Sequence, residues 1–137
     1  MPMNPSEEKY DLVIVKDLVK YFPIRAGVLQ RVKAHVQAVD KVSFSVKEGE
    51  TLGMVGESGC GKTTVGRAIL RLIEPTSGSV FINGEDIVQM RSQSLKQARR
   101  NMQMIFQDPY ASLNPRLPIG ESVMEGLHIH SIGHPRE

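Results

Sequence analysis

The chain has 137 residues, 40% of them apolar, and a formal net charge of +2. This length suits one domain with a modest core, and so small a net charge argues against binding to nucleic acid or to an anionic membrane surface. The single cysteine, Cys60, excludes an internal disulfide and fits a reducing, cytoplasmic setting. The N-terminus lacks the pattern of a secretory signal, and no apolar run approaches the ~18 to 20 residues that span a bilayer.

The first third of the chain is predicted to be mainly β structure. Residues 1–10 are polar and contain proline, which is typical of a loose terminal tail. Alternating apolar residues predict strands over Leu12–Lys16 and His35–Val46. Between these strands, residues 25–34 are predicted to form a basic, exposed loop. Lys47–Glu50 then predicts a turn.

Residues 56–64 read GESGCGKTT, which is the complete G-x-x-x-x-G-K-[ST] pattern of a phosphate-binding loop. A strand is predicted over Thr51–Val55 before this loop, and a helix over Thr64–Ile73 after it. The glycines let the backbone curl so that successive N–H groups point at phosphate oxygens, and the helix N-terminus adds its dipole. A glycine-rich turn without a ligand is the alternative. The motif predicts that the chain binds a nucleoside triphosphate, or descends from a protein that did.

Individual side chains of this loop have distinct predicted roles. Lys62 is expected to reach the β- and γ-phosphates, and the Thr63 hydroxyl is expected to complete the Mg²⁺ shell. We interpret Cys60 as a small residue that the loop tolerates and not as a catalytic thiol. A bound nucleotide should shield it from thiol reagents.

The rest of the chain is predicted to alternate between strands and helices. Proline and glycine in Glu74–Gly78 are signals that end the preceding helix. Asn83-Gly84 predicts a two-residue hairpin turn between strands at Ser79–Ile82 and Glu85–Val88. Three more elements are predicted, namely a basic helix over Ser94–Arg100, a buried strand over Met102–Phe106 and a helix over Ile119–Leu127. This order indicates an α/β nucleotide-binding layout with an added β part.

Aromatic and amide side chains outside the loop are further candidates. Tyr21 or Phe22 could stack on a purine base, although a core residue and a turn residue are the favoured interpretation on position alone. Gln107 follows a predicted strand and could touch Mg²⁺ or an attacking water. A solvated loop residue is favoured for Gln107 when it is considered by itself.

Histidine and basic clusters have simpler interpretations. His128, His130 and His134 form an H-x-H-x-x-x-H cluster, for which solvated surface side chains are favoured over a metal site. The basic run from Arg91 to Arg100 is interpreted as a solvated helix face.

Taken together, these motifs resemble the ATP-binding subunits of ABC transporters, from about Leu12 to the end of the chain. GESGCGKTT resembles the family's Walker A motif, LVKYFP its adenine-stacking loop and IFQDP its Q-loop. EPTSGSVFINGEDI resembles the stretch that links the Walker A helix to the following hairpin. The block FQDPYASLNPR resembles the oligopeptide and dipeptide importers, and within them the second of two paired ATP-binding subunits.

The resemblance implies an α/β fold of the P-loop NTPase class, with a RecA-like core and an antiparallel β subdomain, that stops within the helical subdomain. It divides the chain into a flexible tail over 1–10, a nucleotide-binding core over 11–107 and an incomplete helical subdomain over 108–137. The core contains the β subdomain and the Walker A unit.

The resemblance also implies roles residue by residue. Lys62 would neutralise the β/γ charge of ATP, and Thr64 would meet the α-phosphate. Gln107 would sense Mg²⁺ and the γ-phosphate and pass that state to the membrane subunit. The L-x-K-x-aromatic spacing from Leu18 favours Phe22 over Tyr21 for stacking on adenine. The implied nucleotide contacts are Tyr21, Phe22, Gly56, Glu57, Ser58, Gly59, Cys60, Gly61, Lys62, Thr63 and Thr64, with Lys62 and Gln107 in catalysis and Thr63 and Gln107 at Mg²⁺.

Several motifs that this family needs for hydrolysis are not found after Gln107: the LSGGQ-like signature, the Walker B aspartate, the glutamate that follows it and the switch histidine. We therefore expect that the chain corresponds to the N-terminal half of a subunit and is inactive alone. We also expect it to be marginally stable and aggregation-prone, because the Thr51–Val55 strand would lack a neighbour. Cooperative, reversible thermal unfolding of a monomer would contradict this expectation.

The implied partners are a second ATP-binding subunit in a head-to-tail dimer, transmembrane permease subunits and, indirectly, an extracellular substrate-binding protein. The implied location is the cytoplasmic face of the cell membrane. Nucleic acid is not among the implied partners. Four alternatives stay open: a nucleotide-binding module without turnover, an importer of nickel or another solute, a non-transport ABC ATPase, and an unrelated kinase or GTPase. The absence of an N-K-x-D motif argues against a GTPase.

Overall fold

The computed structural model describes residues 10–27, 31–107, 113–130 and 132–133. The predicted tail, apart from Tyr10, lies outside the described residues, as do His134 and the part of the FQDPYASLNPR block at 108–112. The chain forms two compact units, one ending at Met90 and the other beginning at Arg91. Each unit is described by itself.

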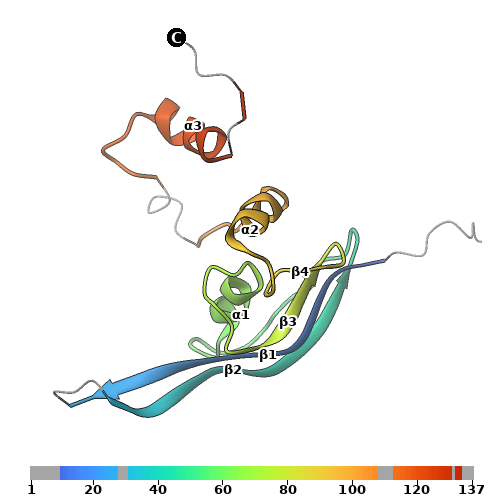
Figure 1. Ribbon diagram of the computed structural model, residues 1–137, viewed down its shortest axis with the longest axis vertical. Helices are drawn as coiled ribbons and strands as arrows, with labels where there is room; N and C mark the ends of the chain where they lie inside the picture. The colour runs from blue at the N-terminus through green and yellow to red at the C-terminus, as the bar shows by residue number, and fades with distance from the viewer. Residues whose placement is uncertain (1–9, 28–30, 108–112, 131, 134–137) are drawn as a thin grey trace, which may run out of the picture. The chain divides into compact units, whose positions relative to one another are not determined.

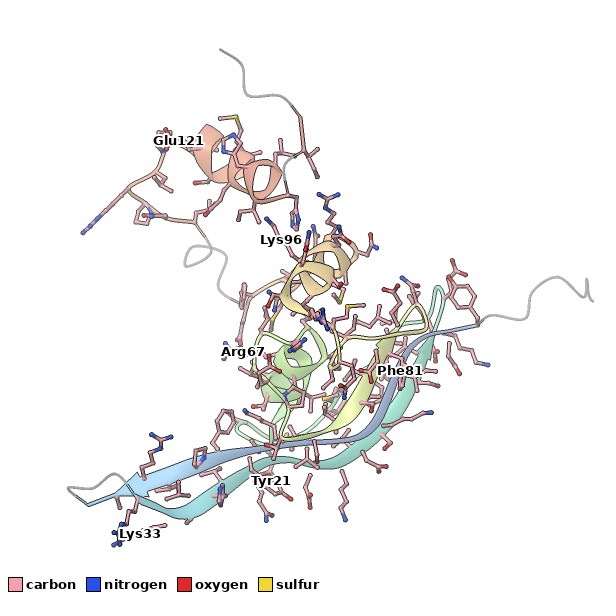
Figure 2. The ribbon with its side chains drawn as sticks, viewed as in Figure 1. Tyr21, Lys33, Arg67, Phe81, Lys96 and Glu121 are labelled. Atoms are coloured by element: carbon pink, nitrogen blue, oxygen red, sulfur yellow. The ribbon has the colours of Figure 1, made fainter. Side chains whose placement is uncertain are left out.

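The first unit is built on an antiparallel sheet in the order β2-β1-β3-β4 (Figure 1). β1 spans Asp11–Ala26, β2 Arg31–Lys47, β3 Ser77–Ile82 and β4 Glu85–Asp86. β1 pairs with β2 along most of its length, and only its first part, up to Val19, also pairs with β3. The far end of the β1–β2 hairpin therefore projects beyond β3 as a two-stranded arm, with Lys33 on it (Figure 2).

This arm contradicts the loop that we predicted over residues 25–34. β1 continues to Ala26 and β2 begins at Arg31, which pairs directly with Ala26. The sequence favoured a loop because the segment is basic. A two-stranded ribbon exposes both of its faces to water, so it accepts charged side chains that a covered sheet would exclude. Pro23 is tolerated because β1 has no β3 partner there to receive an N–H.

The predicted turn at Asn83-Gly84 is confirmed. Asn83 has φ 53° and Gly84 has φ 79°, so both central residues adopt the left-handed conformation that a type I′ hairpin turn requires. The strand after this turn is shorter than predicted, because β4 ends at Asp86, where the Asp86 carboxylate accepts a hydrogen bond from the Val88 backbone N–H at 2.9 Å. That bond replaces the ladder with a local turn.

A single helix, α1 over Lys62–Ile69, covers the sheet and completes the core of the first unit (Figure 1). Its buried residues Val65 and Ala68 pack against strand residues. The remaining buried members of this core are Val15, Leu18, Val39 and Val80, from three different strands. Burial of an aliphatic side chain contributes about 1.5–3 kcal/mol. The packing fixes the position of the helix N-terminus, where the glycine-rich loop ends.

α1 ends four residues before the predicted boundary at Ile73. Arg71 has φ 49°, the left-handed conformation that closes a helix. The Leu72 N–H donates to the Arg67 carbonyl at 2.8 Å and the Arg71 N–H donates to the Ala68 carbonyl at 3.0 Å, which is a Schellman motif. The Arg71 guanidinium bonds the Met90 carbonyl at 2.6 Å, and such tertiary bonds offset the strain of this backbone.

Two of the predicted strands are not formed. Residues 51–55 and 102–106 have no regular secondary structure, and their most exposed side chains, Val55 and Ile105, are 96% and 95% accessible. Strand propensity alone does not make a strand, because each strand needs a partner for its backbone groups. In the described part of the chain, no strand pairs with either run. The exposed apolar runs agree with the expectation of marginal stability, which stays a prediction.

The second unit contains α2 over Ser92–Ala98, a 3₁₀ turn η1 over Arg99–Asn101 and α3 over Ile119–Ile129. These confirm the two predicted helices to within a few residues. Leu95 is the buried residue of α2, whereas α3 buries none of its side chains. Across the described ranges, no helix combines the length and the apolar character that crossing a membrane requires.

Candidate functional site

The glycine-rich loop is an exposed turn that leads directly into α1. Gly59 and Gly61 have φ of 83° and 99°, a left-handed backbone that glycine adopts readily and other residues rarely do. Gly61 is the N-cap of α1, and neither a capping side chain nor an acidic residue occupies the first turn. The helix N-terminus therefore presents backbone N–H groups and an uncompensated positive dipole to whatever lies in the loop. This arrangement suits an anion.

Lys62 occupies the centre of the loop. Its ammonium group donates to the carbonyl oxygens of Gly56 and Glu57, both at 2.6 Å, and to the Cys60 sulfur at 3.4 Å. The lysine thus folds back over its own loop and holds the loop's first residues against its last. An ammonium group in this place can exchange those carbonyls for phosphate oxygens, because both are hydrogen-bond acceptors.

The end of the loop is fixed by a close approach to β2. A Cβ atom added at Gly61 would lie 2.2 Å from the Ala38 carbonyl oxygen, so only glycine fits. Ala38 follows Gln37, which pairs with Tyr21 on β1. The first turn of α1 therefore lies beside the part of the sheet that carries both aromatic candidates. The sequence motif did not indicate this contact, because Ala38 precedes Gly61 by more than twenty residues.

Two threonine hydroxyls lie at the start of the helix that follows the loop. Thr63 is exposed and Thr64 half-buried, in the first turn of α1. A threonine hydroxyl next to the loop lysine is a hard oxygen ligand of the kind that Mg²⁺ prefers. Among the described residues, no cluster of three or more His, Cys, Asp or Glu side chains could hold a metal ion.

The two aromatic candidates have different environments. The Tyr21 hydroxyl donates to the Asp40 carboxylate at 2.6 Å, and its backbone N–H donates to the Thr76 hydroxyl at 2.9 Å. The hydrogen bond to Asp40 raises the pKa of Tyr21, with smaller contributions from burial and from the negative charge of Asp40. These partners tie Tyr21 into the sheet. Sequence reasoning missed Asp40 and Thr76, because cross-strand partners leave no local signal.

Phe22, the other aromatic, is 39% exposed and carries the Lys20 ammonium 4.9 Å from its ring centroid. Lys20 also donates to the Glu74 carbonyl at 2.7 Å, in the segment that follows α1. Since Lys20 and Phe22 are two residues apart on β1, they share a face of the strand. The Phe22 ring is thus partly exposed beside a cation, whereas Tyr21 is bonded through its hydroxyl, and which ring stacks on a base stays a prediction.

The remaining candidates lie in the second unit. Gln107 is exposed, and its predicted role at the loop stays a prediction. His128 is exposed, but His130 is half-buried and accepts hydrogen bonds from Arg100 through its ring nitrogen and its carbonyl oxygen. His130 therefore differs from the solvated side chain that the sequence indicated. The basic run from Arg91 to Arg100 is exposed except at Leu95 and Ala98, as the spacing of a solvated helix face predicts.

The fold and the loop agree with comparisons to known proteins. Residues 39–133 match the family model described as ABC transporter, which covers more than half of the chain. The chain belongs to the ABC transporter family. The match includes the loop, α1 and both described helices of the second unit.

Curated relatives point to the same family. The chain is 53% identical over 118 residues to the glutathione import ATP-binding protein GsiA of Pectobacterium atrosepticum, covering 86% of this chain and 19% of the relative. It is 51% identical over 124 residues to the oligopeptide transport ATP-binding protein AppF of Bacillus subtilis, covering 90% of this chain and 38% of the relative. The chain thus spans well under half the length of these relatives.

A solved structure confirms the fold. The ATP-binding cassette MJ0796, in a dimeric post-hydrolysis state bound to ADP and Pi, matches with a TM-score of 0.71 at 27% identity. The match covers 90% of this chain and 50% of that one. The predicted α/β fold of the P-loop NTPase class is therefore confirmed, with the antiparallel sheet formed and the runs at 51–55 and 102–106 unpaired in the described structure.

Proposed function

We propose that this chain forms the part of an ABC importer's ATP-binding subunit that holds the phosphates and the base of ATP. The observation that carries the proposal is the Lys62 ammonium in the glycine-rich loop, at the N-terminus of a helix that has no acidic residue in its first turn. Family membership and the half-cassette fold support it. The division into a nucleotide-binding core over 11–107 and an incomplete helical subdomain over 108–137 stays a proposal.

Different residues are proposed to contact different parts of the nucleotide. The backbone of Gly56–Thr64 would surround the phosphates, and Lys62 would exchange its bonds to the loop carbonyls for bonds to phosphate oxygens. The Thr63 hydroxyl and the Gln107 side chain would hold Mg²⁺, which when bound would neutralise charge on the β- and γ-phosphates. Thr64 would meet the α-phosphate. The aromatic ring of Phe22 would carry the adenine, with Tyr21 as the second choice.

The larger activity belongs to the longer protein. The relatives' names concern import of glutathione and oligopeptides, so we propose that ATP hydrolysis is coupled to uptake of short peptides. The proposed partners are a second ATP-binding subunit, permease subunits reached through the region of Gln107, and indirectly an extracellular binding protein. Such a subunit would lie at the cytoplasmic face of the membrane. A related importer of nickel or another solute is the alternative.

One titration series tests the proposal at the level of this chain. Calorimetry of the 137-residue chain with MgATP, MgADP, AMP and adenosine, together with an assay of phosphate release, should show binding that depends on the β-phosphate and no turnover. AMP is expected to bind at least about 10-fold more weakly than ADP, because AMP lacks the β-phosphate that the loop and Lys62 are proposed to bind. Equal affinity for adenosine and ATP would contradict the proposal. Phosphate release at steady state would show that these residues suffice for hydrolysis.

The base site gives a separate prediction. Phe22→Ala is expected to weaken ATP binding by about 5- to 150-fold, since stacking of a base on an aromatic ring is worth about 1–3 kcal/mol. Tyr21→Phe keeps a ring and loses only the bond to Asp40, so ATP affinity should stay unchanged. Inorganic triphosphate, which has no base, should bind both variants like the unaltered chain. A loss confined to Tyr21→Ala would instead assign the base to Tyr21.

A further inference from the structure

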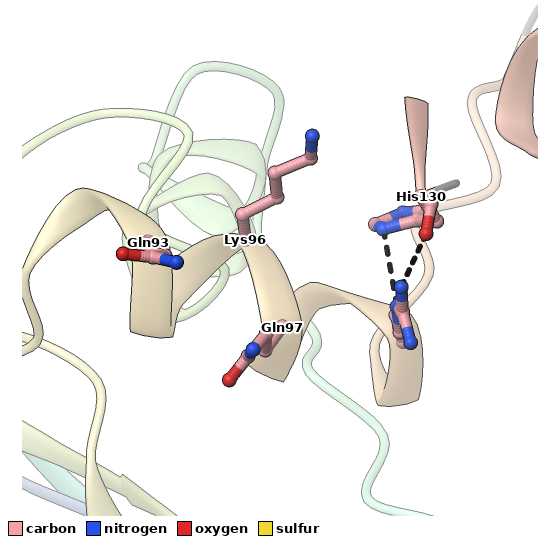
Figure 3. A pocket seen from close by; sticks show the side chains of 5 residues that line it. Gln93, Lys96, Gln97 and His130 are labelled. Carbon is pink, nitrogen blue, oxygen red and sulfur yellow. Dashed lines mark hydrogen bonds between the residues drawn. The ribbon is translucent and has the colours of Figure 1, made fainter. Parts of the chain in front are cut away.

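A cavity lies in the second unit, far along the sequence from the glycine-rich loop. It has a volume of about 270 Å³ and is lined by Gln93, Lys96, Gln97, Arg100 and His130 (Figure 3). The first four recur at the spacing of one helix face along α2 and η1, and His130 follows α3. The ATP-binding role proposed above does not use any of these residues.

All five residues that line this cavity have polar side chains. Each of the five side chains carries a nitrogen that can donate a hydrogen bond, and none is a carboxylate. Lys96 and Arg100 are cations at neutral pH, so the cavity concentrates positive charge without an internal counter-ion among its lining residues. A cavity with this chemistry favours an anion that accepts several hydrogen bonds at once.

Arg100 is held in place by His130. It donates from Nη2 to the His130 carbonyl oxygen and from Nε to the His130 Nδ1 at 3.5 Å, as the dashed lines in Figure 3 mark. With Nδ1 accepting, the proton of a neutral imidazole lies on Nε2, which is a further donor. A guanidinium already fixed by two bonds loses less side-chain entropy when an anion binds.

We propose that this cavity binds a phosphate group. A planar guanidinium and an ammonium group together match the oxygens of a phosphate, and the two glutamine amides and the imidazole supply neutral donors around them. The volume is below the ~300–1,000 Å³ of sites that enclose drug-sized ligands, so the cavity takes the phosphate and leaves the rest of a larger molecule outside. Such a phosphate can come from a soluble ion or from a lipid headgroup.

Side-chain amide signals provide a local test. Inorganic phosphate is titrated into the ¹⁵N-labelled 137-residue chain at constant ionic strength, and the NH₂ signals of Gln93 and Gln97 are followed. A saturable shift is expected, and Lys96→Gln should weaken the apparent affinity about tenfold by removing one charge-assisted contact. The matched control is Lys33→Gln on the β1–β2 arm, an exposed lysine outside the cavity. Phosphate bound in the glycine-rich loop does not interfere, because the two glutamines report only on the cavity.

The outcomes decide the proposal and the source of the phosphate. No shift of either amide signal, or equal weakening by Lys33→Gln and Lys96→Gln, would overturn it. Arg100→Lys keeps the charge but loses the planar guanidinium, so it should give an intermediate loss of phosphate affinity. This second variant keeps the test valid if Lys96→Gln misfolds. Sedimentation with phosphatidylcholine vesicles, with and without phosphatidic acid, separates the sources. Lipid-dependent binding that Lys96→Gln reduces indicates a headgroup, and a phosphate shift without vesicle binding indicates a soluble ligand.

Discussion

Replacing Lys62 by alanine is expected to lower the affinity of the chain for MgATP by about 100-fold or more, because one hydrogen bond to a charged group is worth about 1.5–3 kcal/mol and the ammonium group can make more than one. The ammonium is already placed in the loop, 2.6 Å from two of its carbonyl oxygens. Calorimetry or a fluorescent nucleotide would measure the loss. Retention of most of the affinity would contradict the proposed role of the loop.

Two controls separate binding from folding in this experiment. Lys47→Ala removes an exposed lysine at the end of β2 and should leave nucleotide affinity unchanged. Lys62→Ala also removes the bonds to the Gly56 and Glu57 carbonyls, so the stability of the unliganded chain must be measured as well. Both carbonyls are in an exposed loop and can bond to water instead, so only a small change of stability is expected. A large loss of stability would make the loss of affinity uninformative.

The features that the sequence predicted correctly depend on short-range signals. The Asn83-Gly84 turn requires two left-handed residues in succession, and this pair of residue types adopts that conformation at low cost. The phosphate loop is similar, because its glycines, lysine and helix start are consecutive in the chain. α3 was predicted as a single continuous stretch and begins at Ile119 as predicted. In each case the residues that determine the structure are neighbours.

The predictions that were wrong concern structure that depends on contacts between residues far apart in the sequence. Thr51–Val55 has the composition of a strand, but strand formation is decided by a partner that donates and accepts hydrogen bonds, and the described structure contains none for it. The opposite error was made for residues 25–34, where a loop was predicted and strand residues are found. Cross-strand pairs such as Ala26 with Arg31 form there in spite of the basic composition. Arg71 ended α1 early because its side chain finds carbonyl partners 16 and 19 residues away.

The candidate site likewise combines features predictable from neighbouring residues with features that depend on distant ones. Lys62 and its loop partners were predictable from nine consecutive residues, and the structure adds only their geometry. The difference between Tyr21 and Phe22 was not predictable, because it depends on Asp40 across the hairpin and on Thr76 before β3. The family resemblance implied that one of the two rings stacks on the base, and the hydrogen bonds of Tyr21 give it surroundings that Phe22 does not share. The Ala38 contact with Gly61 is likewise visible only in the fold, although it determines which residue can occupy that position.

Gly61→Ala is expected to destabilise the chain by about 3–5 kcal/mol, because it combines backbone strain with overpacking. Gly61 has φ 99°, which L-residues rarely adopt. A methyl group there would also lie 2.2 Å from the Ala38 carbonyl oxygen, and neither backbone segment can move without disturbing α1 or β2. Since small domains have only about 5–15 kcal/mol of stability, this one methyl group should leave little folded protein. Urea midpoints from pulse proteolysis, which tolerates limited aggregation, would measure the effect.

Substitutions at two other glycines of the same region separate the effect of backbone strain from the effect of the close contact. Gly59→Ala has the strain of φ 83° but no atom within 4 Å of the added Cβ, so a loss of only about 1–2 kcal/mol is expected. Gly66→Ala lies inside α1 with neither strain nor contact, and it should stabilise the helix by about 0.5–1 kcal/mol. The order Gly66, Gly59, Gly61 in increasing cost would show that the close approach to Ala38 dominates. Equal losses at Gly59 and Gly61 would show that backbone strain alone sets the requirement for glycine, and that the loop can move away from β2. In that case the contact with Ala38 would not be what fixes the helix N-terminus beside Tyr21 and Phe22.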